Sequence, residues 1–600
     1  MMFTFGTAMD VRLKDPRPQR NDRFAFVALV SVVFVYVLLR AALIPLVHDE
    51  ATSFLAYAQS GRFLPFSSMW DANNHYLNSL LGWLGYKVFG LHLLALRWGS
   101  VLAFALFAWS TWKLGAFIQH RFVRWVFWSA MLGCPFLLDF FSLFRGYGPA
   151  FAFLLFGMYE LLCFVRDGRT AQLVRVLFAL AVANSFLLAL LPLWGVMLGV
   201  LLIAAYRNRK QRALWFFAGL LPFAAALLLA LRLAHLGLLY QGSTEGFVEV
   251  TVMSLLQRMF GTGSIALAVV ILVMIVLVTA IVLRSAIRAR GWRSPAFLVA
   301  ILLWGEALGR IIAANAFGIN YAEDRTALHT LLLTIVFATF AVDGWCMQGR
   351  MAWVFALPLL ILPLRAAWTA NLDHTVLWPE QSIPDRFVRR VQELERTLGR
   401  PPVVGTHRHA GLPWSLQYRM LGSESDANAH SWPHGMDDVR IVVPSVLKEA
   451  ISGFGVVDSA PGNLLLLLLR DPPLHTDVVF DTTFTLNSNG SDRSLPIALP
   501  AEQLRGSDLL VEVEGRLSAD ADPVDLRLSF AVSDSSDAIL YGDFVFLNTR
   551  RAQWNGEHWQ SIRHIPQQPR AAKAVLFLWT PDSADYQWKE GRVIVRSVLR

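Results

Sequence analysis

Apolar stretches of about twenty residues recur through the first part of the chain, between Phe24 and Ala370. A helix needs about that length to cross a hydrocarbon core of roughly 30 Å, whereas the helices of a soluble core do not. The pattern therefore predicts about eleven transmembrane helices. We expect them at residues 24–44, 92–112, 123–142, 147–165, 172–190, 192–206, 213–235, 263–283, 295–314, 326–345 and 351–370.

The pattern changes after residue 371. Residues 385–398 have the apolar spacing of an amphipathic helix, and short apolar runs follow it, which favours an α/β region over residues 371–475. Residues 476–600 alternate apolar and polar positions between turn residues, as the strands of a β-sandwich do. The predicted fold class is a polytopic α-helical membrane protein, with a transmembrane domain over 24–370 and an α/β plus β-sandwich region after it.

The net charge of +9 is explained by where the basic residues lie. They gather in an N-terminal tail, residues 1–23, and then in every second connection between the predicted spans. The positive-inside rule places these segments in the cytoplasm. An odd number of spans then puts residues 371–600 on the other side. We expect a multi-pass protein of a bacterial inner membrane with a periplasmic C-terminal domain, and no nucleic-acid partner.

Sequence motifs exclude several kinds of chemistry. The cysteines Cys134, Cys163 and Cys346 lie in or at the ends of predicted spans, so the C-terminal domain has no disulfide framework and zinc-type spacing is missing. No Walker loop, GxGxxG turn or GxSxG elbow stands where it could work. His407 and His409 form a weak metal signal. We expect no required cofactor and leave a divalent metal open.

Two acidic residues, Asp49 and Glu50, follow the first predicted span directly. Placing carboxylates at a membrane surface costs free energy unless they are hydrated, paired with a cation or needed for function. One of them could act as a general base toward an acceptor hydroxyl. The alternative is a solvated pair that marks the end of a helix, and spacing alone does not decide between the two.

Further polar residues fall in three other stretches that the topology places on the same outer side. These connections are far apart in the chain, but their common depth permits one wet cavity. The residues are Asp71, Asn73, Asn74 and His75, then Asp139, Arg145 and Tyr147, then Tyr321, Glu323, Asp324 and Arg325.

Several arginines lie near the outer ends of predicted spans. A guanidinium there either snorkels to lipid headgroups or holds a phosphate through paired donors. Glu306 and Arg310 are four residues apart and could pair on one helix face. We expect at least one phosphate ligand among the set, which comprises Arg40, Arg97, Arg232, Arg310 and Arg365.

The order of these motifs over residues 24–370 resembles that of the GT-C glycosyltransferases. The resemblance rests on the acidic pair after the first span, the loop WDANNHYLNS, the connection FRGYGPAFAF and the late connection YAEDRTALHTLLL. The most similar branch is the bacterial one that contains the aminoarabinose transferase of lipid A and the protein O-mannosyltransferases. The loop WDANNHYLN differs from the commoner Pro-x-x-His-Pro-Pro form.

The resemblance implies a GT-C fold and transfer of a sugar, with inversion, from a polyprenyl-phosphate donor to an envelope acceptor that is a lipid, glycan or protein. It implies that Asp49 is the catalytic base with Glu50 beside it. It also places the donor phosphate near Arg145, Tyr147 and Arg325, to which we add Arg310. The remaining expected substrate contacts are Asp71, Asn74, His75, Tyr321, Glu323 and Asp324.

Two other functions stay open. A transporter or flippase of lipid-linked or amphiphilic cargo would carry charges near the middle of the membrane and show paired halves. A noncatalytic assembly protein of the envelope would use its soluble domain to bind partners. The charges at the outer ends of the spans favour the transferase.

Overall fold

The structure is a computed structural model, and it describes residues 20–206, 213–288, 291–346, 351–423, 425–426, 429–430, 435–487, 491–519, 526–547, 558–581, 583 and 585–599. Most of the predicted N-terminal tail and the basic cluster at 207–212 lie outside these residues. The chain forms two compact units. The helical unit is Met1–Ala42, Trp70–Leu81 and Arg97–Leu372, and the strand-rich unit is Leu43–Met69, Gly82–Leu96 and Asp373–Arg600. Each is described by itself.

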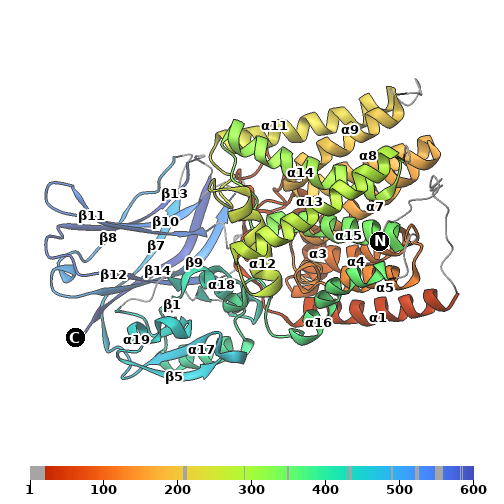
Figure 1. Ribbon diagram of the computed structural model, residues 1–600. Helices are drawn as coiled ribbons and strands as arrows, with labels where there is room; N and C mark the ends of the chain where they lie inside the picture. The colour runs from red at the N-terminus through yellow and green to blue at the C-terminus, as the bar shows by residue number, and fades with distance from the viewer. Residues whose placement is uncertain are drawn as a thin grey trace. The chain divides into compact units, whose positions relative to one another are not determined.

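Long helices form the helical unit (Figure 1). They are α1 (Arg20–Leu43), α4 (Leu93–Gly115), α5 (Arg121–Leu132), α6 (Pro135–Asp139), α7 (Tyr147–Asp167), α8 (Thr170–Phe186), α9 (Leu191–Ala205), α11 (Leu221–His235), α12 (Met253–Phe260), α13 (Ile265–Arg288), α14 (Pro295–Phe317), α15 (Leu328–Cys346) and α16 (Ile361–Trp368). The helix α3 (Tyr76–Phe89) begins in this unit, and short helical turns such as η2 (Leu188–Leu190) and η5 (Asp324–Ala327) join the long helices.

Among the described residues, 8 helices are long and apolar enough to cross a membrane, and two shorter apolar helices, Thr170–Phe186 and Ala352–Trp368, accompany them. A strand-rich region follows this helical part. The predicted fold class is therefore confirmed: a membrane-type helical region precedes a C-terminal region rich in strands. The total of eleven spans stays a prediction.

The continuous helix predicted over residues 123–142 is wrong. The helix α5 ends at Leu132, and α6 starts only at Pro135. Proline has no backbone N–H and disfavours the helical conformation in the residue before it, and Cys134 is accordingly extended. A side chain at Gly133 would also meet Pro363 of α16, with a Cβ 2.6 Å from the Pro363 Cβ. The break lets α16 pack closely against the end of α5.

One end of the helical unit gathers the start of α1, the start of α5 and the end of α15. Asp22 accepts hydrogen bonds from Arg121 at 3.0 Å and from Trp125 at 3.2 Å. Asp343 of α15 accepts the backbone N–H groups of Gln119 and His120. These are segments that the charge pattern assigns to one side of the membrane, so the helices that begin and end here agree with the alternating topology.

The first part of the strand-rich unit is a mixed sheet with helices. Its strand order is β3-β1-β4-β6-β5, and its amphipathic helix is α17 (Asp385–Leu398). Phe387, Val388 and Val391 of α17 pack in one buried cluster with residues of the central strands. The strands are β1 (Val404–Thr406), β3 (Ala429–His430), β4 (Val439–Val442), β5 (Phe454–Ser459) and β6 (Leu466–Arg470), and α18 (Gly411–Met420) follows β1.

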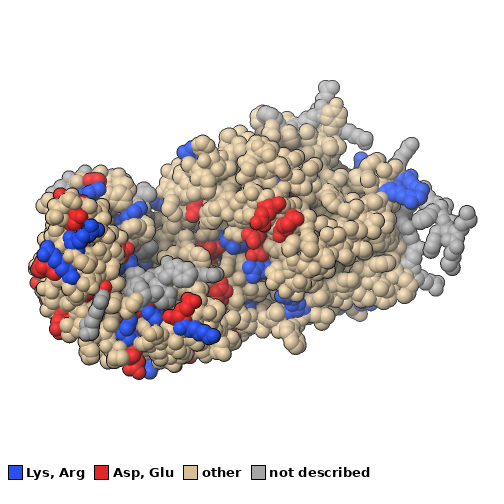
Figure 2. All heavy atoms as spheres, turned by 60° about the vertical axis from the view of Figure 1, so that its left-hand side comes forward, with Lys and Arg blue, Asp and Glu red and all other residues tan. Residues whose placement is uncertain are grey.

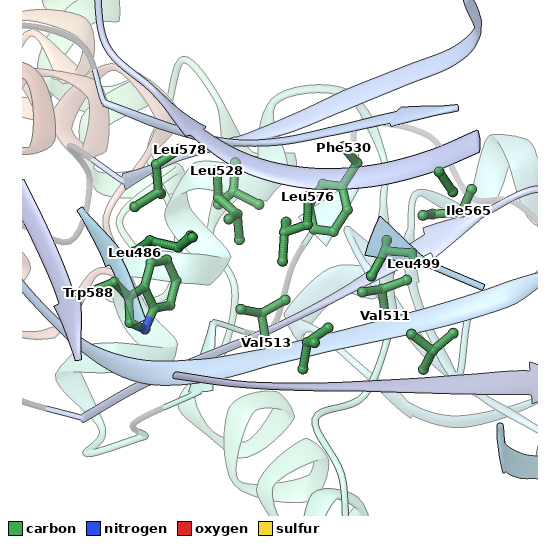
Figure 3. Packing of buried hydrophobic residues seen from close by; sticks show 14 of the residues in the cluster. Leu486, Leu499, Val511, Val513, Leu528, Phe530, Ile565, Leu576, Leu578 and Trp588 are labelled. Carbon is green, nitrogen blue, oxygen red and sulfur yellow. The ribbon is translucent and has the colours of Figure 1, made fainter. Parts of the chain in front are cut away.

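Two largely antiparallel sheets form the rest of this unit, with orders β11-β10-β13-β8 and β2-β12-β9-β14-β7. Inward side chains of both sheets meet in one hydrophobic cluster, which Figure 3 shows from close by. The strands are β2 (Ser425–Asp426), β7 (Thr476–Asn487), β8 (Ile497–Leu499), β9 (Leu509–Ala519), β10 (Arg527–Ser533), β11 (Ile539–Phe546), β12 (His558–Ile565), β13 (Lys573–Trp579) and β14 (Tyr586–Val598). Alternating burial along β10 matches the alternation in its sequence, whereas β13 alternates in burial although all its residues after Lys573 are apolar.

The surfaces of the two units differ in charge. Figure 2 shows charged side chains scattered over the strand-rich unit, whereas most of the helical surface in that view is uncharged. Large apolar side chains such as Val32 of α1, Val270 of α13 and Leu228 of α11 are exposed. Such a surface suits the hydrocarbon of a bilayer and not water.

Candidate functional site

The helical unit contains a cavity of about 450 Å³. Its walls come from five separate segments, at residues 71–76, 145–147, 184–195, 223–241 and 309–326. These segments include connections that the sequence pattern places on one side of the membrane. The volume falls within the range of about 300–1,000 Å³ that small-molecule sites occupy.

Arg145 is fully buried in the short connection between α6 and α7, where it lines the cavity. Its Nη2 donates a hydrogen bond to the side-chain oxygen of Asn73 at 2.6 Å, and its guanidinium stands 5.8 Å from the centre of the Tyr147 ring. The residue between them has to be small. A Cβ on Gly146 would lie 2.1 Å from the carbonyl oxygen of Phe186 and 2.9 Å from the His75 ring. The sequence Arg-Gly-Tyr therefore holds a guanidinium and a phenol against the same wall.

His75 is fixed in both orientation and tautomer. Its Nδ1 lies 2.6 Å from the carbonyl oxygen of Phe186, and its ring meets the Tyr147 ring edge to face at 5.2 Å. Because a carbonyl oxygen only accepts, Nδ1 carries a hydrogen and donates it to Phe186.

The loop before His75 brings a carboxylate to the cavity. The side chain of Asp71 accepts the backbone N–H of Asn73 at 2.7 Å, and the hydroxyl of Tyr240 lies 3.4 Å from the same oxygen. Asn74 accepts a hydrogen bond from Ser79 at 3.0 Å. Burial and then the charge of Asp71 raise the pKa of Tyr76 to about 12. Tyr76 thus stays neutral at ordinary pH, and Asp71 is the carboxylate of this wall.

Arg310 enters the cavity from α14 and confirms the predicted pairing with Glu306. Its Nε donates to Glu306 Oε1 at 2.7 Å. Its Nη2 donates to the backbone carbonyl of Ala189 in η2 and lies 3.2 Å from His329 Nε2. The same Glu306 oxygen is 2.6 Å from His329 Nε2. Three groups from three segments therefore surround this guanidinium.

Arg325 reaches the cavity from η5. Its Nη2 donates to the side-chain oxygen of Gln241 at 3.2 Å. The neighbouring Asp324 turns elsewhere, because Arg258 holds its carboxylate through two bonds of 2.8 and 3.2 Å. Asp324 adopts a φ of 48°, an unfavourable backbone conformation for a residue with a side chain. The Arg258 pair offsets that cost and so positions Arg325.

Three of the expected substrate contacts do not line the cavity: Tyr321, Glu323 and Asp324. The hydroxyl of Tyr321 accepts a hydrogen bond from Asn315 at 3.1 Å. Burial, and then the charge of Asp324, raise the pKa of the Glu323 carboxyl. In the helical unit, these residues shape the connection that carries Arg325.

Asp49 and Glu50 belong to the strand-rich unit, in the short helix α2 (His48–Ser53). Glu50 is fully buried, and its carboxylate accepts the backbone N–H of Val47 at 3.2 Å, which caps the helix. Asp49 is partly exposed. The predicted role of Asp49 as a base stays a prediction.

The other arginines near the ends of spans bind protein groups. Arg40 pairs with Asp139 and donates to the carbonyl of Asn371 at 2.7 Å. Arg97 donates to the carbonyl of Ala41 at 3.1 Å, and Arg365 donates to the carbonyl of Met259. Arg232 stands 6.0 Å from the Trp70 ring centre. Of the five arginines in this set, Arg310 is the one that lines the cavity.

Another part of the cavity lining is apolar. Its walls are the sides of α9, α11 and α14, and α14 packs against α9. The lining side chains there include Leu191, Phe223, Leu227, Leu231, Ile312 and Phe317. Leu227 and Leu231 among them are 38% and 40% exposed.

Sequence reasoning missed several groups that line the cavity or hold its arginines. Tyr240 and Gln241 lie in a long connection without a motif, and the Ala189 carbonyl belongs to the backbone. Asn184, near the end of α8, is 6% exposed and lines the cavity. A polar residue in the last turn of an otherwise apolar span is the signal that could have found Asn184.

A metal centre was left open by the sequence. Among the residues that the structure describes, no group of three or more His, Cys, Asp or Glu side chains is placed to hold a metal ion. The ring of His409 packs on that of His48 in the strand-rich unit, with centres 4.7 Å apart.

No protein-family model and no curated protein matches the chain. Solved structures similar to it include two of ArnT from Cupriavidus metallidurans. The one bound to undecaprenyl phosphate shares 14% identity, with a TM-score of 0.40 over 75% of this chain and 98% of that chain. The apo form shares 13% identity, with a TM-score of 0.38 over the same shares. ArnT is a GT-C glycosyltransferase, the class that residues 24–370 resemble. At these values the likeness carries no inference about the reaction.

Proposed function

We propose that the chain is an inverting glycosyltransferase that moves a sugar from a polyprenyl-phosphate donor to an acceptor of the bacterial cell envelope. The observation that carries the proposal is the composition of the cavity. Arg145, Arg310 and Arg325 all line it, and so do apolar side chains of α9, α11 and α14. An anionic headgroup on a long hydrocarbon chain matches both sets of side chains. Undecaprenyl phosphate, which the similar ArnT structure binds, is a compound of this kind.

The three arginines are suited to stabilise a phosphate that acts as the leaving group. As the bond between sugar and phosphate breaks, negative charge grows on the phosphate oxygens, and fixed guanidinium donors stabilise that charge more than they stabilise the intact donor. Arg145 and Arg310 are held in place by Asn73 and Glu306, so little reorganisation is needed during the reaction. Arg325 adds a third guanidinium from η5.

Two carboxylates have different proposed roles. Inversion needs a base on the face of the sugar away from the phosphate, and the family resemblance assigns that base to Asp49. Asp71, held by Asn73 and close to Tyr240, is proposed to bind hydroxyl groups of the sugar. Asn74 and His75 would orient the donor from the same loop.

The proposed site faces the periplasm, where the strand-rich unit would hold a bulky acceptor. This orientation follows from the basic residues in alternate connections. Acceptors to be tried are envelope lipids, glycans and secreted proteins.

A transfer assay tests the proposal. Purified full-length protein in lipid nanodiscs is incubated with radiolabelled polyprenyl-phosphate sugars and envelope extracts, and labelled acceptor is measured. We expect transfer by the wild type, loss of turnover with retained donor binding in Asp49→Asn, and weaker donor binding in Asp71→Asn. Equal turnover in the wild type and Asp49→Asn would contradict the base assignment.

One observation favours transport as a second candidate function. Glu306 and His329 form a buried ionisable pair near the middle of α14, and such pairs also serve proton-coupled transporters. A transporter would move labelled lipid-linked sugar across a sealed vesicle without breaking the bond between sugar and phosphate. Transfer of label to an acceptor in the assay above would decide for the enzyme.

A further inference from the structure

The buried group behind Arg310 has unused hydrogen-bonding capacity. Among the described residues, Glu306 Oε2 and His329 Nδ1 are buried and have no hydrogen-bond partner. Both residues are essentially inaccessible, with 1% and 0% of their surface exposed. Buried polar atoms are normally paired, so atoms that are not paired call for an explanation.

The shorter of two contacts assigns the hydrogen of His329: Nε2 lies 2.6 Å from Glu306 Oε1, an acceptor, and 3.2 Å from Arg310 Nη2, a donor that cannot bond to a protonated Nε2. Arg310 Nε and His329 Nε2 both approach Glu306 Oε1, at 2.7 and 2.6 Å. A carboxylate accepts from both when His329 carries its hydrogen on Nε2. The lone pair of the neutral imidazole is then on Nδ1. This nitrogen is the atom of the group that can take up a further proton.

Arg310 is shared between this group and the cavity. Its Nε and Nη2 bind Glu306 and the Ala189 carbonyl, whereas Nη1 has no hydrogen-bond partner among the described residues. A guanidinium has five N–H donors, two of them on Nη1. Nη1 is therefore the part of the side chain that is left for an anion in the cavity.

The charges of the buried group around Arg310 cancel only while no anion is bound in the cavity. With His329 neutral, the charges of Glu306 and Arg310 cancel. An anion bound to Arg310 adds negative charge beside a buried carboxylate, which is costly where the effective dielectric constant is low. A proton on His329 would cancel the charge of Glu306 and leave Arg310 to the anion.

Other charged groups near the pair are few. On the helices that pack against α14, α9 has no titratable side chain and α13 carries Arg284 and Arg288 in its last turns. On α15 the other titratable groups are Asp343 and Cys346, near its far end, where Asp343 binds Gln119 and His120. On the cavity side the charged or titratable side chains are Asp71, His75, Tyr76, Arg145, Tyr147, Tyr240 and Arg325.

We propose that binding of the lipid-linked phosphate at Arg310 is coupled to the uptake of one proton by the Glu306–His329 pair, at His329 Nδ1. The proton comes from water, and no covalent bond changes. This inference rests on the proposed function only in taking a phosphate-bearing lipid as the ligand. The coupling makes two affinities of the cavity depend on pH: that for the polyprenyl-phosphate sugar, and that for the polyprenyl phosphate that remains after transfer.

Calorimetry of the full-length protein in detergent tests the coupling, with undecaprenyl phosphate as the probe. The heat of binding is measured at one pH in two buffers of different ionisation enthalpy, which gives the number of protons taken up. The lipid phosphate titrates near pH 6, so variants are compared at pH 7.5. We expect the wild type to take up close to one proton more than His329→Gln. The dissociation constant of the wild type should rise by up to about tenfold per pH unit, and that of His329→Gln should stay nearly flat.

A second variant keeps the test decisive if His329→Gln does not fold. Glu306→Gln removes the buried negative charge, so we expect it to bind the lipid without proton uptake. His235→Gln, at the exposed end of α11, is the matched control and should behave as the wild type. Equal proton uptake in the wild type, His329→Gln and Glu306→Gln would overturn the coupling and leave the phosphate site intact. Absence of binding by the wild type would overturn the proposed phosphate site itself.

Discussion

The cavity in the helical unit has polar and apolar lining residues, called here its polar end and its apolar end, and the two sets are held in different ways. At the polar end, hydrogen bonds fix each lining group individually, as the contacts of Arg145 with Asn73 and of His75 with the Phe186 carbonyl show. At the apolar end, helix sides of α9, α11 and α14 supply a surface without directional bonds. The difference indicates an amphiphilic ligand. Hydrogen bonds in fixed directions would recognise its headgroup, whereas its hydrocarbon tail would need only an apolar space of sufficient volume.

Because of this contrast, substitutions at the two ends should affect ligand binding in different ways. A displacement of a fraction of an ångström matters where hydrogen bonds select the ligand, whereas only lost space matters along an apolar groove. Substitutions at the polar end should therefore reduce binding of any phosphate ligand. Those at the apolar end should discriminate between long and short chains.

The largest effect is expected for Arg145→Ala. Hydrogen bonds to charged groups contribute about 1.5–3 kcal/mol, and the arginine can offer more than one to a phosphate. We expect about a hundredfold loss of affinity for undecaprenyl phosphate, measured by calorimetry. Arg145→Lys should recover part of it, because lysine keeps the charge but lacks the planar fork. Arg166→Ala, at the other end of α7, is the control and should bind normally.

A smaller loss, of about thirtyfold, is expected for Gly146→Ala, because a misplaced arginine loses part of its hydrogen bonds. The new Cβ would clash with the Phe186 carbonyl and the His75 ring, so Arg145 or His75 must move. Gly199→Ala on α9 is the matched control, since no atom lies within 4 Å of a Cβ there. Normal affinity in Gly146→Ala would show that the polar end tolerates displacement.

Gly195→Leu tests the apolar end. A Cβ at Gly195 would stand 3.5 Å from the Phe223 ring, in ordinary contact, so the added side chain should fill the cavity without breaking the helix packing. We expect about tenfold weaker binding of undecaprenyl phosphate and unchanged binding of a short-chain alkyl phosphate, as the lost burial of a few CH₂ groups implies. Equal losses for both chain lengths would mean that the tail does not lie there.

The smallest effect is expected for Tyr240→Phe. The hydroxyl of Tyr240 meets Asp71 at 3.4 Å, a long and weak contact. Its loss should lower affinity for a polyprenyl-phosphate sugar by about twofold and leave binding of the sugar-free lipid phosphate unchanged. A large loss with the sugar-free lipid would place Tyr240 at the phosphate and not at the sugar.

The sequence predicted the polar end better than the apolar one. Arg145, Tyr147 and His75 could be found because charged and aromatic residues between apolar spans are conspicuous. The pairing of Glu306 with Arg310 followed from their spacing on one helix. The apolar groove could not be predicted, because Leu227 and Phe223 look like any other residues of a span until neighbouring helices are placed.

Two kinds of structural feature could not be predicted from the sequence: contacts made by backbone groups, and a break within an apolar helical segment. Backbone groups such as the carbonyls of Phe186 and Ala189 carry no residue signature, yet they fix His75 and Arg310. The break between α5 and α6 was overlooked because Gly133 and Pro135 stand in a stretch that is otherwise apolar enough to cross a membrane. Hydropathy measures composition, and the break arises from backbone geometry.

The most direct test of the central claim is a structure of the full-length protein determined with bound undecaprenyl phosphate. The phosphate should lie within hydrogen-bonding distance of Arg145, Arg310 and Arg325, with the chain running along α9, α11 and α14. A phosphate bound elsewhere, with this cavity empty or filled only by a hydrocarbon tail, would contradict the claim that the two ends recognise one amphiphilic donor.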